Sequence, residues 1–563
     1  MKNVNYNKIV IESQDLIRNI DGITGSDAFE EIIKIIFTMN LFSTQKLDST
    51  SLKFFYTDKV FPKYDFFIGD YIKLKDITIE QILYLFSDVD FESEDIRGRL
   101  FETYLGRVFT SGLGQFFTPR EIVEFITGFL HKKNLIPKNA LILDPACGSS
   151  GILLTARNSE TGKIVGYDIN ERLVRVSKMN MVLHGIENYE INNQSFLKCP
   201  DEEIYDVCIT NPPFGVEEKQ KDILKEFILG YDKKSCDLEI LFIEKILKVL
   251  KPGGICGIVL PDGVFNNITS IKLREYILQH SNIIASIDLP ENVFKSSGTG
   301  CETGILFFRK KENNIESQIN FEAYKIDFVG YETQTKFAKK IPKNDLKDIL
   351  NDVEGIQKTI VTRLNSTKRL DGKYYFRKEK NKNKLIMDIF ENSGKKVGDI
   401  YKNDSEIIRY IQYTDIDPVF GIIKSYTEME VSEAPSRAKI VINTGDILIP
   451  KLKQSSDKIA IVTEEFDGCV ATNGFKVIRP KNGKNSELVF ALFRDKKIQE
   501  QLQDFSSGTI MPSIDDDYFN EVVFIDGDVN EDELTKKVKE IFELIDIAKN
   551  KMIELNYSMN MGT

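Results

Sequence analysis

Short apolar runs alternate with a helix-like segment through the middle of the chain. The runs have the length and the isoleucine- and valine-rich content of buried strands, and they cover residues 141–143, 163–168, 207–209, 255–260, 283–289 and 303–308. Residues 238–250 have the pattern of a buried helix, which the stop signal Lys251-Pro252-Gly253-Gly254 ends. Because strands and helices alternate, we expect an α/β, Rossmann-like core, a mostly parallel sheet with helices on both faces.

The two ends of the chain carry helical patterns. Near the start, apolar residues recur at helical spacing, and they are Phe29, Ile32, Ile33, Ile36 and Phe37. At the end, apolar residues are spaced alternately four and three apart, as in a coiled-coil seam, and they are Leu534, Val538, Ile541, Ile545, Ala548, Met552 and Leu555. A helix that packs on its own domain would show the same spacing.

These patterns predict a division of the chain into successive parts. We expect a helical packing or docking domain over 1–105, the α/β core over 106–335 and a basic linker over 336–395. Short β-like runs then predict an α+β domain over 396–530, followed by a spacer helix over 531–563.

Composition narrows the class of protein. The 563 residues are enough for two to four domains. There is no apolar run long enough to span a membrane and no apolar signal-like core at the start. The chain has 7 cysteines without a Cys-x-x-Cys pair and only 3 histidines, which disfavours a disulfide framework and a zinc site. We therefore expect a cytoplasmic protein without a metal. The net charge of −11 disfavours a protein coated in nucleic acid but allows a local basic groove.

The stretch Ile209–Gly215 carries the sharpest chemical signal. Asn211-Pro212-Pro213-Phe214 follows an apolar strand, and the prolines hold this loop stiff and extended. The amide oxygen of Asn211 and the carbonyl of Pro212 are acceptors for a ring amine, and Phe214 offers an aromatic face. The same residues also suit an ordinary turn between a strand and a helix.

A second loop has the features of a cofactor cradle. Asp144 ends one predicted strand, and a small-residue loop with Gly148 and Gly151 leads from it into an apolar helix. Asp168 ends the next strand, where an acid can bind both hydroxyls of a ribose. Neither a Walker loop nor the Gly-x-Gly-x-x-Gly fingerprint is present. Since ligands of open α/β sheets lie at the strands' carboxyl ends, the cradle and Asn211 are expected to converge.

Thr118 and Pro119 open another predicted helix. Thr118 suits the cap position, Pro119 the first helical position, and Glu121 completes a capping-box pattern. These residues fit a well-made helix start, and they also fit a helix start that closes over a small bound molecule.

A series of motifs follows in order from Gln115 to Phe308. The motifs are Gln115-Phe116-Phe117-Thr118-Pro119-Arg120, Asp144-Pro145-Ala146-Cys147-Gly148-Ser149-Ser150-Gly151, Asn211-Pro212-Pro213-Phe214-Gly215, Leu250-Lys251-Pro252-Gly253-Gly254 and Leu260-Pro261-Asp262-Gly263-Val264-Phe265. Together they resemble the amino-methyltransferase domain of the modification subunit of type I restriction-modification systems. The resemblance implies transfer of a methyl group from S-adenosylmethionine to N6 of a flipped adenine in duplex DNA.

The resemblance also implies a set of site residues. It assigns the target base to Asn211, Pro212, Pro213 and Phe214. It assigns S-adenosylmethionine to Gln115, Phe117, Thr118, Pro119, Asp144, Pro145, Ala146, Gly148, Ser149, Gly151, Asp168, Gln194 and Asn211. This chain departs from the family twice. Ser150 stands where a glycine is usual, and Gln194 stands at the position of an acid that often contacts the adenine ring of the cofactor.

The C-terminal part resembles one target-recognition domain of a type I specificity subunit. The matching stretches are 410–416, 445–449, 471–477 and 507–512. The resemblance implies duplex DNA as a partner, and a C-terminal helix that pairs with a second copy or with a specificity-type subunit. The basic stretch 358–384, with Tyr374, Tyr375 and Phe376 interleaved, fits phosphate contacts or a solvated linker. No nuclease segment is evident, so cleavage would require a separate restriction subunit.

Three other functions stay open from the residues alone. The first is methylation of cytosine N4, because the same loop would bind any ring amine. The second is methylation of a protein glutamine or of RNA, since Asn-Pro-Pro loops occur in those enzymes too. A non-catalytic DNA-binding subunit of a defence complex is the third.

Overall fold

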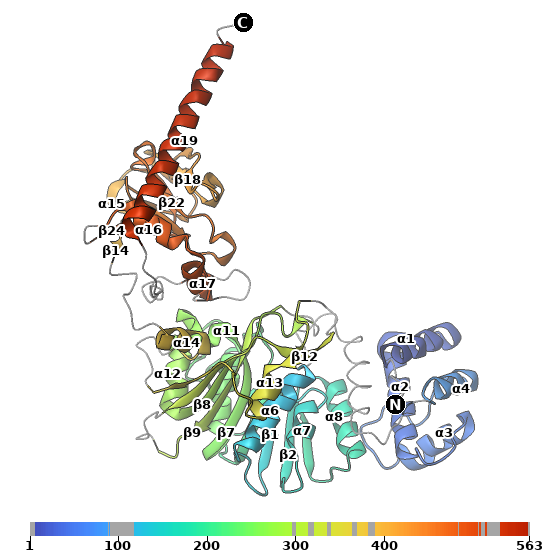
Figure 1. Cartoon of the computed structure of the whole chain (residues 1–563). Helices are drawn as coiled ribbons and strands as arrows, with labels where there is room; N and C mark the ends of the chain where they lie inside the picture. The colour runs from blue at the N-terminus through green and yellow to red at the C-terminus, as the bar shows by residue number, and fades with distance from the viewer. Residues whose placement is uncertain are drawn as a thin grey trace. The chain divides into compact units, whose positions relative to one another are not determined.

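A computed structural model describes residues 6–87, 89, 118–295, 300–313, 320–334, 339–362, 369–380, 389–481, 484–504, 506–507, 513–514 and 530–560. The chain forms two compact units (Figure 1). The first unit comprises residues 1–265 and 270–372, and the second comprises residues 266–269 and 373–563. We describe each unit by itself.

The first unit is built on a nine-stranded sheet in the order β13-β10-β8-β9-β7-β4-β1-β2-β3. The strands are β1 (Leu141–Asp144), β2 (Lys163–Asp168), β3 (Tyr189–Asn193), β4 (Tyr205–Thr210), β7 (Leu250–Pro261), β8 (Ser281–Asp288), β9 (Thr303–Lys310), β10 (Phe321–Lys325) and β13 (Lys358–Val361). Neighbours from β3 to β7 are parallel, whereas β9 runs antiparallel between β7 and β8. The expected Rossmann-like α/β core is therefore confirmed.

The sheet order sets the position of the functional edge. The chain leaves β1 toward β2 on one side, while β4 pairs with β1 on the other side. This reversal is the topological switch point at which open α/β sheets bind ligands. Asp144 ends β1, and Asn211 directly follows β4 at the same edge.

Helices cover this sheet and supply its core. They are α6 (Arg120–Lys132), α7 (Gly151–Ala156), α8 (Glu171–Leu183), α9 (Lys221–Leu224), α10 (Leu238–Val249), α11 (Asp262–Asn266), α12 (Ile271–His280) and α13 (Asp345–Leu350). The apolar face of α6 packs on the central strands, with the ring of Phe129 stacked on that of Phe307 at 4.5 Å. The continuous apolar pattern of residues 238–250 forms α10, as the sequence predicts.

The N-terminal helices share a core with α8. They are α1 (Tyr6–Leu16), α2 (Gly25–Leu41), α3 (Ser49–Phe55) and α4 (Asp76–Leu85). Leu173, Val176 and Met179 of α8 lie in the same apolar cluster as the N-terminal helices, and Arg175 forms an ion pair with Glu30. One helix of the α/β core thus anchors the N-terminal part.

The expected linker over 336–395 is wrong for its first part. Residues 340–344 form β12, which pairs with β11 (Val329–Tyr331), and β13 is an edge strand of the main sheet. Lys358 is paired with Glu322 at 2.6 Å, and Arg369 is fully buried against Asp371. Tyr374 and Tyr375, in α14 (Gly372–Lys380), are buried. Arg369 and the two tyrosine rings are therefore buried and are not available to phosphates or bases, whereas Lys358 is paired with Glu322 but keeps an exposed side chain.

The described part of the second unit contains helices, two larger sheets and two two-stranded sheets, β17 (Ile416–Asp417) with β18 (Ile422–Ile423) and β25 (Ser506–Ser507) with β26 (Ser513–Ile514). A four-stranded sheet has the order β14-β24-β21-β22, and a five-stranded sheet has the order β15-β20-β23-β16-β19. The strands are β14 (Phe390–Asn392), β15 (Lys395–Lys396), β16 (Ile407–Ile411), β19 (Thr427–Glu430), β20 (Ala438–Val441), β21 (Ile447–Pro450), β22 (Ala460–Ile461), β23 (Val470–Thr472) and β24 (Phe475–Pro480). The helices α16 (Ser486–Phe493) and α17 (Lys496–Asp504) follow. This part is α+β, as its short apolar runs predict.

The long C-terminal helix is α19 (Glu531–Asn560). Its first turns pack on its own unit, where Val538 is buried and Phe542 meets Phe490 edge-on at 5.8 Å. Further along, Leu544, Ile547 and Met552 are 65%, 51% and 57% exposed. The described part of the chain contains no helix that is both long enough and apolar enough to cross a membrane.

Candidate active site

The loop after β4 presents an amide whose orientation is fixed. Asn211 Nδ2 donates a hydrogen bond to Thr118 Oγ1 at 2.9 Å. Asn211 Oδ1 is buried and has no hydrogen-bond partner among the described residues. A buried polar atom without a partner costs about 1–3 kcal/mol, so the fold keeps an acceptor ready for a ligand donor at this point.

Thr118 has a different role from the one its sequence pattern suggests. Helix α6 begins at Arg120, and Pro119 is its cap residue, which is extended at φ −53° and ψ 139° and makes no side-chain cap bond. The expected capping box of Thr118 and Glu121 is therefore wrong. The hydroxyl of Thr118 lies outside the helix and binds Asn211 instead. Gln115 and Phe117 lie outside the described residues.

Phe214 lies in an aromatic corner. Its side chain is buried, and its ring meets Phe294 edge-on, with centroids 6.1 Å apart and planes at 89°. Pro212 and Pro213 precede it, and Gly215 follows with φ +65°. Phe294 was not predicted from the sequence, because nothing near it in the sequence indicates that it contacts a loop 80 residues earlier. An edge contact of this kind fixes the orientation of the Phe214 ring.

Asp144 is a buried carboxylate at the switch point. Its Oδ1 accepts the amide of Ala146 at 3.0 Å, so the Pro145-Ala146 turn closes on it. Its Oδ2 has no hydrogen-bond partner among the described residues. Burial raises the pKa of Asp144 to about 7. This is the signature of a carboxylate whose favourable partner is a ligand.

The loop after Asp144 turns tightly around an open space. Gly148 has φ +52°, and a β-carbon built on it would meet no atom within 4 Å. Its amide donates to Asp168 Oδ2 at 3.1 Å, while Asp168 Oδ1 accepts the amide of Asn170 at 2.8 Å. Burial raises the pKa of Asp168 as well. The carbonyl of Ser149 accepts a hydrogen bond from Asn180 of α8 at 2.9 Å, and Gly151 begins α7.

Ser150 stands where the resembled family has glycine, and the backbone conformation at this position explains the family's preference for glycine. It has φ +68°, a left-handed conformation that costs most residues about 1–2 kcal/mol. Its buried hydroxyl is hydrogen-bonded to Ser177 of α8. The serine is thus accommodated by a partner on the helix behind the loop.

Two further residues flank the cradle. Gln194 is exposed and follows β3, whose last residue, Asn193, donates to the carbonyl of Asp168 at 3.1 Å. Ile169, the residue after Asp168, is 73% exposed despite being apolar. The sequence analysis missed Ile169, although an apolar residue directly after a strand-end acid is a usable signal. An exposed apolar side chain beside a candidate ribose site suits contact with a flat ring.

The described cradle fits S-adenosylmethionine, a positively charged nucleoside cofactor. The buried carboxylate of Asp144 and the partly buried carboxylate of Asp168 both have raised pKa values and provide charge and acceptors for hydroxyl groups. The open turn at Gly148 and the exposed Ile169 provide space and ring contact. Of the predicted residues, Asp144, Gly148, Asp168 and Gln194 lie along the ends of β1, β2 and β3, and Thr118 and Asn211 lie beside the end of β4.

Comparison with known proteins identifies relatives of the first unit. Residues 92–371 match the family model described as N-6 DNA Methylase. The EcoEI methylase subunit of a type I restriction enzyme from Escherichia coli is 29% identical over 323 residues, which is 53% of this chain and 63% of that protein. The MpnII methylase subunit of Mycoplasma pneumoniae is 25% identical over 281 residues, which is 42% of this chain and 51% of that protein. The chain thus spans between half and two thirds of these relatives' lengths.

One solved structure resembles both units in fold. The alignment with the type IIG restriction endonuclease BpuSI covers 95% of this chain and 74% of the BpuSI chain, with a TM-score of 0.53 and 12% sequence identity. At this identity the likeness concerns the fold alone.

Proposed function

From the match of residues 92–371 to the N-6 DNA methylase family model, we propose that this chain methylates adenine N6 in duplex DNA. The observation that carries the proposal is the amide of Asn211. Its nitrogen donates a hydrogen bond to Thr118, and its buried oxygen has no hydrogen-bond partner among the described residues. An exocyclic ring amine is the donor that this oxygen suits.

The residues of this chain would act chiefly by placement. Asn211 Oδ1 and the Pro212 carbonyl each accept one hydrogen from the amine, which draws its lone pair out of conjugation with the ring. Phe214, held by Phe294, stacks on the flipped base and offsets part of the few kcal/mol lost in unstacking. Correct placement of two reactants can supply most of the catalysis.

The cofactor side follows from the same edge of the sheet. Asp168 would hold the ribose hydroxyls, Ile169 and Gln194 would border the adenine ring, and the turn at Gly148 and Ser149 would line the rest. S-adenosylmethionine, when bound, supplies an electrophilic methyl group on a positively charged sulfur. The ionised carboxylate of Asp144 would favour that positive charge in a buried site.

The test is transfer of tritium-labelled methyl groups to unmethylated DNA. We expect Asn211→Ala to lower the turnover by about 100-fold or more, because both the acceptor and its placement are lost. Asn192→Ala is a matched control, since Asn192 lies in β3 and its side chain makes one hydrogen bond among the described residues, to Glu190 at 3.0 Å. Equal transfer by the wild type and Asn211→Ala would refute the role of this loop.

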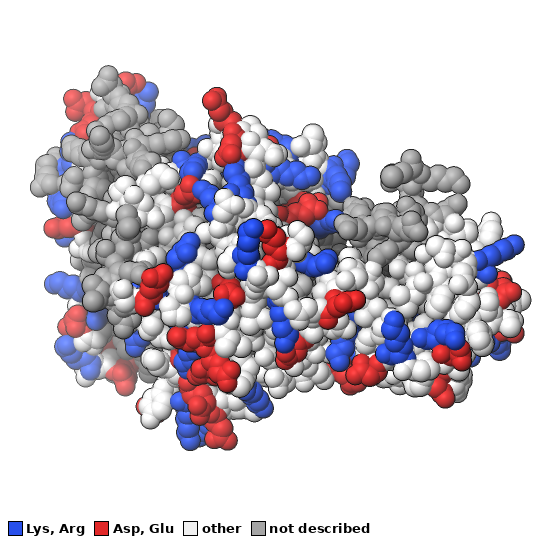
Figure 2. All heavy atoms as spheres, turned by 90° about the horizontal axis from the view of Figure 1, so that it is seen from below, with Lys and Arg blue, Asp and Glu red and all other residues white. Residues whose placement is uncertain are grey.

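We infer that the second unit recognises the DNA target. Its support is the resemblance of residues 410–416, 445–449, 471–477 and 507–512 to a specificity subunit. Several of these residues, such as Ile411, Ile447 and Val477, are buried in its sheets, so they maintain the fold while exposed loops would read bases. Figure 2 shows one face of the whole molecule, on which basic and acidic side chains are interspersed. Binding of duplex DNA by residues 373–563 expressed alone, with affinity falling steeply with salt, is the check.

We also infer that α19 pairs with a second copy or with a specificity-type subunit. The exposed Leu544, Ile547 and Met552 leave apolar surface on its second half, as at an uncovered helix seam. Replacing Leu544 and Ile547 by Asp should abolish the association measured by light scattering. An unchanged mass would contradict the pairing. A restriction subunit would be a separate chain.

A further inference from the structure

Helix α8 holds the turn of the cofactor cradle through two buried polar side chains. Ser177 and Asn180 lie one turn apart on this helix and are 0% and 2% exposed. The hydroxyl of Ser177 is hydrogen-bonded to that of Ser150, and Nδ2 of Asn180 donates to the carbonyl of Ser149 at 2.9 Å. The two contacts therefore reach neighbouring residues of the same turn.

The hydrogen bond from Asn180 acts on the peptide unit that joins Ser149 to Ser150. The carbonyl of this unit accepts that bond, and its amide, which belongs to Ser150, donates to the carbonyl of Cys147 at 2.7 Å. Ser150 has φ +68°, a left-handed conformation that costs a serine about 1–2 kcal/mol. A flip of the peptide unit would return Ser150 to a negative φ, but it would break both hydrogen bonds. The bond from Asn180 thus opposes the relaxation that a serine favours.

Helix α8 is a fixed point of attachment for this turn, because it is packed on two apolar cores. Val174 and Met181 lie in the core beneath the main sheet. Leu173, Val176 and Met179 lie in the core of the N-terminal helices. A helix held by both cores does not move with the loop, so a hydrogen bond from it restrains the loop.

We propose that Asn180 is a positioning residue for cofactor binding, which holds the peptide unit between Ser149 and Ser150 in the orientation that the cradle requires. The proposal rests on the function proposed above, in which the turn at Gly148 and Ser149 lines the S-adenosylmethionine site. Asn180 acts through the backbone, since its donor is used by Ser149. Without this bond the turn would divide between two orientations, and the apparent affinity would fall with the fraction that is competent to bind.

The unused oxygen of Asn180 supports this role. Asn180 Oδ1 is buried and has no hydrogen-bond partner among the described residues. A buried acceptor without a partner costs about 1–3 kcal/mol, so an apolar side chain of similar size would suit the packing of α8 better. The hydrogen bond to the turn explains why an amide stands at this position.

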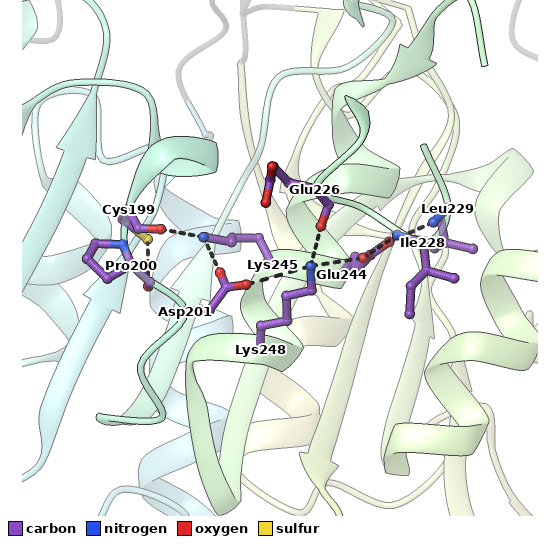
Figure 3. A network of polar contacts seen from close by, with 9 residues as sticks. All are labelled: Cys199, Pro200, Asp201, Glu226, Ile228, Leu229, Glu244, Lys245 and Lys248. Carbon is purple, nitrogen blue, oxygen red and sulfur yellow. Dashed lines mark hydrogen bonds and ion pairs between the residues drawn. The ribbon is translucent and has the colours of Figure 1, made fainter. Parts of the chain in front are cut away.

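Helix α10 anchors a loop in a similar manner at a place that carries no predicted site residue. Figure 3 shows Glu244, which is fully buried and accepts the amides of Ile228 and Leu229 at 2.7 and 2.8 Å. Lys248 pairs with Glu244 at 3.2 Å and donates to the carbonyl of Glu226 at 2.7 Å. Glu244→Gln is therefore a matched control, because it weakens a loop anchor that is remote from the predicted cradle residues in these contacts.

Hydrogen exchange of the full-length protein without cofactor tests the anchor directly. The amide of Ser150 belongs to the peptide unit that Asn180 holds, and peptides spanning 145–152 report it by mass spectrometry. We expect Asn180→Ala to speed its exchange about tenfold, the loss of one hydrogen bond of ordinary strength. Glu244→Gln should speed exchange at Ile228 and Leu229 and leave Ser150 unchanged.

Calorimetric titration with S-adenosylmethionine supplies the second measurement. We expect Asn180→Ala to raise the Kd about tenfold, while kcat at saturating cofactor stays within about twofold of the wild type. In the Ser150→Gly protein the left-handed turn no longer carries its cost, so adding Asn180→Ala should raise the Kd by about threefold or less. Ser177→Ala, a milder change, should raise the Kd about threefold.

Three results would overturn the proposal. They are wild-type exchange and affinity in Asn180→Ala, an equal rise of the Kd when this substitution is made in the Ser150→Gly protein, and an equal rise of the Kd in Glu244→Gln. If Asn180→Ala does not fold, a wild-type Kd in Ser177→Ala overturns it instead. If the wild type binds no S-adenosylmethionine, the proposed function fails, and exchange of the Ser150 amide alone decides whether Asn180 holds this peptide unit.

Discussion

Replacing Asp144 by Asn should make the protein without cofactor more stable while weakening its affinity for the cofactor. Asp144 is fully buried, and only one of its oxygens has a hydrogen-bond partner among the described residues, namely the amide of Ala146. An asparagine at this position keeps an acceptor for that amide and removes the buried charge. The expected gain is therefore an electrostatic one.

The pKa of Asp144 sets the size of the effect. A rise from 3.8 to about 7 corresponds to about 4 kcal/mol of unfavourable free energy for the ionised form. The amide nitrogen that the substitution introduces would be buried beside the Thr210 hydroxyl, which also lowers the pKa of Asp144 slightly, and imperfect pairing there costs about 1–2 kcal/mol. The net gain in the free energy of unfolding at about pH 8 is then about 2 kcal/mol.

The sign of the pH dependence is specific to an acid with a raised pKa. The penalty is fully present above the folded pKa of about 7, and it disappears as the pH falls toward the unfolded value near 4. Urea unfolding of both proteins without cofactor should therefore show the advantage of Asp144→Asn at about pH 8 and its loss near pH 4.5.

A buried carboxylate with partners provides the opposite control. Asp446 is fully buried and is paired with Arg479 at 2.7 Å, and it also accepts the amide of Asn443 at 2.8 Å. We expect Asp446→Asn to destabilise the second unit by about 3 kcal/mol. If Asp144→Asn lowered stability at about pH 8 in the same way, the interpretation of Asp144 as a charge awaiting a ligand would be refuted.

Three further predictions concern the residues around the site. Thr118→Val removes the acceptor that orients Asn211 and should lower kcat about tenfold, while Thr118→Ser should keep it; label transfer measures both, and equal rates would contradict the role of Thr118. Ser177→Ala leaves the Ser150 hydroxyl buried without its partner and should lower the free energy of unfolding in urea by about 1–2 kcal/mol. Ser150→Gly should change that free energy little, because glycine relieves the cost of the left-handed backbone and this offsets the lost hydrogen bond. A large loss of stability in Ser150→Gly would contradict this balance. Arg369→Met removes the cation that is paired with the buried Asp371 and should lower the free energy of unfolding by about 3–5 kcal/mol. Combining Arg369→Met with Asp371→Leu should restore most of this stability. If stability is not restored, the pair has a role beyond the mutual neutralisation of its two charges.

Much of the fold and part of the site follow from local sequence patterns. The strands before Asp144, Asp168 and Asn211 are apolar runs closed by a polar residue, so their ends could be placed to within a residue or two. Parallel pairing then brings these ends to one edge, which is why the cradle and the Asn211 loop could be expected to meet.

The rest depends on contacts that no local pattern specifies. Thr118 has every feature of a helix cap, yet tertiary packing assigns its hydroxyl to Asn211. In the sequence, Lys358 and Arg369 resemble part of a basic linker. The partner of Lys358, Glu322, is distant in the sequence, and Asp371, the partner of Arg369, is one of only a few acids in a basic stretch. Both cations are nevertheless paired within the first unit. Phe294 contacts Phe214 from a segment that is distant in the sequence, and only the fold reveals this contact.

The central claim is that the loop at Asn211 delivers an adenine amine for methylation. Its most direct test is nucleoside analysis of unmethylated DNA after incubation with the purified chain and methyl-labelled S-adenosylmethionine. The account predicts label in N6-methyladenine for the wild type and a rate of labelling lower by about 100-fold or more for Asn211→Ala. Label in N4-methylcytosine, or equal label in N6-methyladenine for both proteins, would contradict it.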